Sequence, residues 1–126
     1  MRKVFLLLAL SAMFTTGVRS AETEMSVDLM QSIEDTNKSL ASNIALANKQ
    51  AATTDARELT QMFAQVEAHF TGKGDAVNAV DLARQSKDLS ANIVKLVAAN
   101  DFTAATDAST ALSRTCRTCH TFYKKE

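Results

Sequence analysis

The chain has 126 residues with 14 basic and 14 acidic side chains, and only 6% of its residues are aromatic. A nucleic-acid partner would need a clustered basic face, and no Lys or Arg run is longer than Lys124-Lys125, so this class of partner is excluded. The length suits one domain with one core, and no segment of the mature chain carries the roughly 20 apolar residues of a membrane span.

Residues 1–20 have the pattern of a secretory signal peptide. A basic start is followed by the apolar stretch 4–14, and Val18 and Ser20 are small residues at positions −3 and −1 of a cleavage site. We therefore predict cleavage after Ser20, export to the bacterial periplasm, and a single mature domain over 21–126.

The mature chain has the composition of an all-α protein. Proline is absent, Gly72 and Gly74 are its only glycines, and residues that cost little in a helix dominate elsewhere. Apolar residues recur at steps of three and four, as on one helix face. The expected helices begin at Ser26 or Asp28, at Thr54 or Asp55, at Asp75, and after the hinge Asn100-Asp101. The inward stripe expected of the first comprises Val27, Met30, Ile33, Asn37, Leu40, Ile44 and Ala47.

Short connections between helices with one apolar stripe predict an antiparallel up-down-up-down four-helix bundle. In such a bundle the start of the first helix faces the end of the fourth. We therefore expect Met30 to lie at the level of His120. We expect Met62 to be a core residue, and His69 to be solvated at the opposite end of the bundle from the end of the fourth helix.

The motif Cys116-Arg117-Thr118-Cys119-His120 near the C-terminus predicts covalent attachment of one haem c. On a helix these cysteines and the histidine fall within about 100° of arc, so both thiols can add to the haem vinyl groups while the imidazole reaches iron. A thioredoxin-like site needs a βαβ setting, a zinc site needs a second ligand pair, and a disulfide across this spacing is strained.

The tail from Ser113 to Lys124, with this motif on the last of four helices, resembles the class II cytochromes c. These are the cytochrome c′ group and its low-spin, methionine-ligated relatives. The resemblance implies that His120 is the proximal iron ligand and that the distal group comes from the first helix, where Met30 stands on the inward stripe.

The expected function is electron transfer to a redox partner protein, with His120 and Met30 as axial ligands and no enzymatic activity. A small peroxidase is a weaker alternative, since the first helix carries no distal His or Arg to help cleave an O–O bond. A thioether is a soft ligand that raises the potential of iron. The alternative is a five-coordinate, cytochrome c′-like protein that binds nitric oxide or carbon monoxide.

The residues around the motif allow two interpretations each, one functional and one structural. Tyr123 packs along the haem edge or in the core, and Arg117 pairs with a haem propionate or lies on the surface. Lys124 and Lys125 form a docking patch for an acidic partner or a solvated helix end. Leu29, off the main stripe, is a weak indication of a homodimer.

Overall fold

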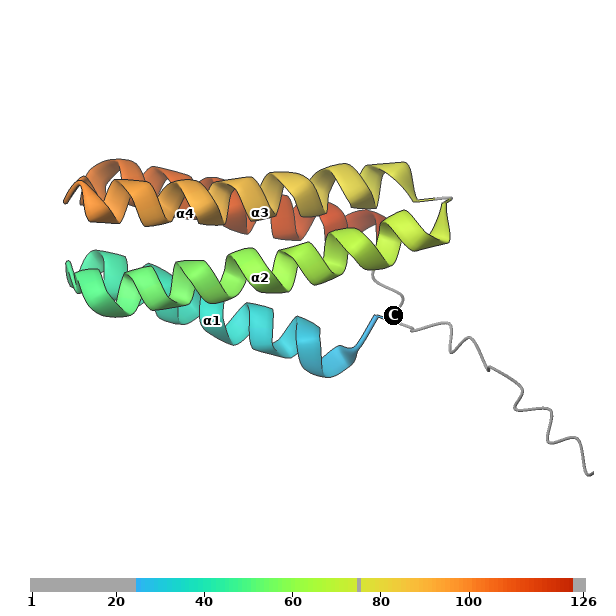
Figure 1. Ribbon diagram of the computed structural model, residues 1–126, viewed down its shortest axis with the longest axis horizontal. Coiled ribbons are helices and arrows are strands. Elements are labelled where there is room, and N and C mark those ends of the chain that lie inside the picture. Colours follow the sequence, from blue (N-terminus) through green and yellow to red (C-terminus); the bar gives the residue numbers. More distant parts are fainter. Residues whose placement is uncertain (1–24, 75, 124–126) are drawn as a thin grey trace, which may run out of the picture.

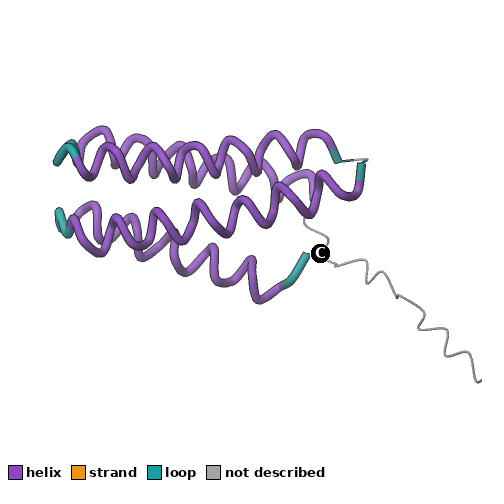
Figure 2. The backbone as a smooth tube through the Cα atoms, in the orientation of Figure 1, coloured by secondary structure: helices purple, strands orange, loops and turns teal. Residues whose placement is uncertain are grey.

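The computed structural model describes residues 25–74 and 76–123. The predicted signal peptide 1–20, Asp75 and the pair Lys124-Lys125 lie outside the described residues. Within the described ranges the protein is all-helical (Figures 1 and 2). Its helices are α1 (Val27–Ala45), α2 (Lys49–Lys73), α3 (Val77–Ala98) and α4 (Phe102–Tyr123).

Side chains and one left-handed residue fix the helix ends that the sequence predicted. The Ser26 hydroxyl accepts a hydrogen bond from the backbone N–H of Leu29 at 3.4 Å, which caps α1. The carboxylate of Asp101 accepts one from the N–H of Ala104 at 3.0 Å, which caps α4. Gly74 ends α2 with φ of 73°, a left-handed conformation that glycine adopts without strain.

The predicted start of the second helix at Thr54 or Asp55 is wrong, because α2 begins at Lys49. The side chain of Asn48 caps the helix by accepting a hydrogen bond from the N–H of Ala51 at 3.2 Å. This capping lets the first turn form, and Ala52 in that turn is fully buried. The segment predicted as a break is therefore helix.

Successive helices run in opposite directions, as the colours of Figure 1 show. The ammonium of Lys49 donates to the carbonyl of Ala98 at 3.0 Å, which joins the start of α2 to the end of α3. At the other end of the same pair, Arg84 donates to Glu67 at 3.1 Å, and Lys87 also pairs with Glu67. The hydrogen bond from Lys87 lowers the pKa of Glu67. We call the end that holds the starts of α1 and α3 and the ends of α2 and α4 the cysteine end.

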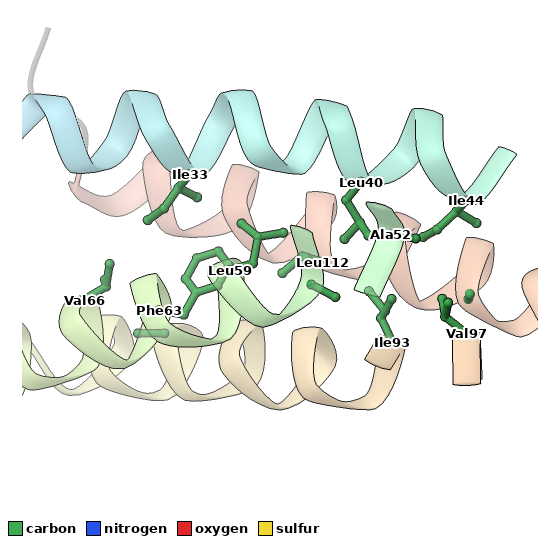
Figure 3. Packing of buried hydrophobic residues seen from close by; sticks show 13 residues of the cluster. Ile33, Leu40, Ile44, Ala52, Leu59, Phe63, Val66, Ile93, Val97 and Leu112 are labelled. Carbon is green, nitrogen blue, oxygen red and sulfur yellow. The ribbon is translucent and has the colours of Figure 1, made fainter. Parts of the chain in front are cut away.

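The core lies along the bundle axis, where apolar side chains of all four helices meet. Figure 3 shows Ile33 of α1 pointing toward Leu59 and Phe63 of α2, and Leu40 and Ile44 farther along α1 beside Ala52 of α2. Small residues let the helices approach closely, above all α3 against α2, the pair with the most extensive contact. The buried positions of α3 are Ala79, Ala83, Ser86, Ser90, Ile93 and Val97.

The ends of the predicted α1 stripe differ from expectation. Val27, the first residue of α1, is 78% exposed and so does not belong to the inward stripe. Ala47 is exposed and has φ of 51°, because α1 has already ended at Ala45. Met62 is half-buried and packs against the core, which agrees with its predicted role. Among the described residues, no helix combines the length and the apolar character needed to cross a bilayer.

Two leucines test how far the core stabilises the bundle. Leu59 is fully buried, whereas Leu46 is 73% exposed. We expect Leu59→Ala to lower the free energy of unfolding by about 3 kcal/mol, since it removes buried apolar surface and leaves a cavity. Leu46→Ala should change it by less than about 0.5 kcal/mol. Urea unfolding followed by circular dichroism measures both, and equal losses would contradict the packing described.

Candidate functional site

The two cysteines lie on the inner side of α4 at the cysteine end. They continue the buried stripe of this helix, since Leu112, Cys116, Cys119 and Tyr123 follow one another at steps of four, three and four. Both thiols are free and half-buried, and Cys116 packs against the hydrophobic core. Two nucleophilic sulfurs one helical turn apart therefore face the same interior region.

Burial controls the acidity of these thiols. Burial, together with the neighbouring Cys119, raises the pKa of Cys116 from its ordinary 9.0 to about 11. Burial also raises the pKa of Cys119. Both groups are therefore protonated thiols at neutral pH.

His120 lies on the flank of α4 that faces α1, and it is exposed. The amide nitrogen of Asn37 in α1 donates a hydrogen bond to the hydroxyl of Ser113 in α4 at 3.1 Å. His120 comes seven residues after Ser113, and Met30 comes seven residues before Asn37. Seven residues make about two helical turns, so residues seven apart lie on nearly the same face of a helix. Because α1 and α4 are antiparallel, moving two turns back along α1 and two turns forward along α4 from this contact reaches the same level of the bundle. This register implies that Met30 and His120 share a level.

Met30 occupies the α1 side of this pair and is half-buried against the core. Met25 and Leu29 pack against the same core from the start of α1. The seam between α1 and α4 is the least extensive contact between neighbouring helices in the bundle, and Figure 1 shows α1 leaving the line of α2 toward its start. Met30 and His120 thus stand on the two helices, α1 and α4, whose mutual contact is the least extensive.

The predicted position of His69 is wrong. Because α2 and α4 point the same way, His69 near the end of α2 lies at the cysteine end and not opposite to it. Its ring contacts Phe70 edge-on with centroids 5.0 Å apart, and Phe70 contacts Tyr123 of α4 at 5.5 Å. His69 is half-buried, and its Nε2 is buried without a hydrogen-bond partner among the described residues. It is therefore not a solvated surface histidine.

The remaining predicted residues fall into two groups. Tyr123 is half-buried and stacks on Phe70 with its ring tilted by 45°, so it belongs to the packed end of the bundle. Leu29 is also partly buried. Arg117 is exposed, and so is Phe122 at 63%. The structure thus gathers Cys116, Cys119, His120, Met30 and Tyr123 at one end and leaves the Arg117 side chain in solvent.

Comparisons of the chain with protein-family models, with curated proteins and with solved structures found no match. The site is therefore interpreted from its own chemistry. Among residues 25–74 and 76–123, no group of three or more His, Cys, Asp or Glu side chains could hold a metal ion.

The donor set includes groups that could hold a covalently attached metal complex. Two protonated thiols on one helix can form thioether bonds, and the adjacent imidazole supplies a nitrogen ligand from the same helix. A soft thioether stands at the same level across the seam. The buried, unpartnered Nε2 of His69 is a polar atom for which the described residues provide no partner. Cys116, Cys119, His120 and Met30 are therefore the residues that could hold a haem c.

The raised thiol pKa predicts a pH dependence of stability. The folded protein holds the Cys116 proton more tightly than the unfolded chain, so this contribution is complete below pH 9.0 and is lost as pH rises toward about 11. We expect a loss of about 2 kcal/mol, measured by urea unfolding of the free-thiol protein with reductant present. Cys116→Ala should lack this component, and parallel pH curves for the two proteins would contradict it.

The unpartnered nitrogen of His69 predicts a stability cost. We expect His69→Leu to raise the free energy of unfolding of the haem-free protein by about 1 kcal/mol, because a buried polar atom without a partner is removed. Gln65→Leu, one turn earlier on an exposed position, serves as the control and should have little effect. A clear destabilisation by His69→Leu alone would mean that the imidazole has a stabilising partner.

Proposed function

We propose that this protein is a monohaem c-type cytochrome that carries electrons. Cys116 and Cys119 would hold the haem through thioether bonds, His120 would bind the iron from α4, and Met30 would bind it from α1. The observation that supports the proposal is the register of α1 and α4: the Asn37–Ser113 hydrogen bond implies that Met30 and His120, each seven residues away from it, lie at one level.

The role of each residue follows from its chemistry. The two thiols would fix the group to α4, so its position would be set by this helix. His120 supplies a nitrogen ligand, and the thioether of Met30 is a neutral, soft ligand that favours the ferrous state. When bound, the haem supplies one-electron chemistry, and the protein supplies orientation and an apolar surrounding.

The packing of the bundle supports insertion between α1 and α4. Separating these helices would break fewer contacts than opening any other neighbouring pair, because their seam is the least extensive. The half-buried Cys116, Cys119 and Met30 would become buried against the ring, whereas His120 is exposed in the haem-free chain. The extensive α2–α3 contact can stay intact and hold the fold while the seam opens.

The proposal includes a location and a partner class. If residues 1–20 direct export, the cytochrome works in the periplasm and passes electrons to another redox protein there. The partner would meet the cysteine end, where the exposed His120 and Phe122 lie next to the proposed haem.

The ligands can be tested on protein co-produced with a c-type haem attachment system. We expect haem that stays bound after denaturation, and a ferric spectrum with a far-red sulfur-to-iron band. Met30→Ala should abolish that band because it removes the thioether, and His120→Ala should abolish the normal haem spectrum. Met62→Ala, another half-buried methionine, is the matched control and should keep the band.

Two outcomes would contradict the proposal in different ways. Absence of covalent haem would reject the cytochrome assignment as a whole. Covalent haem that is high-spin and binds carbon monoxide at once would instead establish the open, five-coordinate site of a gas-binding protein, with Met30 as a core residue only.

A further inference from the structure

We propose that His69 is a second distal ligand, whose Nε2 binds the haem iron whenever the thioether of Met30 is not bound there. This inference rests on the proposed function and deepens it. It concerns a histidine of α2, outside the Cys116–His120 motif and outside the α1 position that the sequence identifies as distal.

The first support is the side of α2 on which His69 lies. Asp55, Met62 and His69 follow one another at seven-residue steps and so share one flank of the helix. The Asp55 carboxylate accepts hydrogen bonds from Ser39 and Asn43 of α1, both at 2.8 Å. Met62 lines a groove between α1 and α2. The flank that carries His69 therefore faces α1, which is the Met30 side of the proposed haem.

The second support is its level along the bundle. The contact of Phe70 with Tyr123 puts the end of α2 beside the last turn of α4. Tyr123 lies three residues beyond His120, which is about 4.5 Å along a helix. His69 directly precedes Phe70, so its backbone is within about one turn of the level shared by His120 and Met30. An imidazole side chain can span that offset.

The third support is the state of the ring. Nε2 is buried and has no hydrogen-bond partner among the described residues, and the ring contacts Phe70 edge-on. A neutral imidazole with its proton on Nδ1 has a free lone pair on Nε2, the form that binds metals. The chain has only two histidines, so His69 is its one imidazole besides the proposed proximal ligand.

The exchange of ligands is balanced. The sulfur of Met30 withdraws one lone pair from the iron and Nε2 of His69 donates another, so the coordination number, the electron count and the protons are unchanged. The consequence is a site that stays six-coordinate when Met30 is displaced or oxidised to its sulfoxide. This would keep small gaseous ligands from an open iron position and preserve a low-spin electron carrier.

The test uses the haem-loaded protein and compares ferric spin states by absorption and electron paramagnetic resonance. We expect Met30→Ala to lose the sulfur-to-iron band but to remain low-spin, with two nitrogen ligands. Met30→Ala combined with His69→Phe should be high-spin, and added imidazole should restore its low-spin spectrum. Met30→Ala with Gln65→Phe places the same ring one turn earlier on α2 and should stay low-spin. Met30→Ala with His69→Gln replaces the phenylalanine variant if that one does not fold.

Each other result has a definite meaning. If Met30→Ala alone is high-spin, His69 does not reach the iron, and the inference is rejected while the cytochrome assignment stands. The same rejection follows if the double variant remains low-spin, since another group then binds. If no covalent haem is present in the wild-type protein, the proposed function and this inference fall together.

Discussion

A half-buried amide joins α1 to α4 and marks their register. Asn37 stands in the apolar stripe of α1 and donates to Ser113 across the seam, while its Oδ1 is buried without a partner among the described residues. A polar residue at such a position costs stability but favours one alignment of two helices over shifted ones. In this bundle the favoured alignment is the one that brings Met30 level with His120. The proposed axial pair thus depends on a contact two turns away from it.

The neighbouring helix pairs of the bundle differ in how extensively they pack. Small residues on α3 and the Glu67, Arg84 and Lys87 cluster join α2 and α3 closely. The seam between α1 and α4 is less extensive. A bundle with equally tight seams would have no place for a planar group without losing its core. Concentrating the packing in one pair leaves the opposite seam free to accommodate the proposed haem.

His69 shows where reasoning from the sequence failed and why. The prediction treated the end of the second helix as remote from the end of the fourth, although in an up-down-up-down bundle the even-numbered helices run in parallel and end together. The alternating directions of the four helices were therefore enough to predict that His69 lies at the same end of the bundle as the end of the fourth helix. What the sequence could not reveal is that the Nε2 atom is buried and unpartnered, because this depends on side chains from other helices.

The chain's own pattern determined the all-α class, the caps at Ser26 and Asp101, the inward stripe of α4 and the C-x-x-C-H motif, because each depends on neighbours within a turn or two. The local pattern misjudged the start of α2, where the cap at Asn48 and the burial of Ala52 extend the helix. Only the tertiary structure decided which seam is loose, that Cys116 is buried enough to raise its pKa, and that His69 joins the cysteine end. These properties arise from contacts between helices far apart in the chain, whose closeness no local spacing encodes.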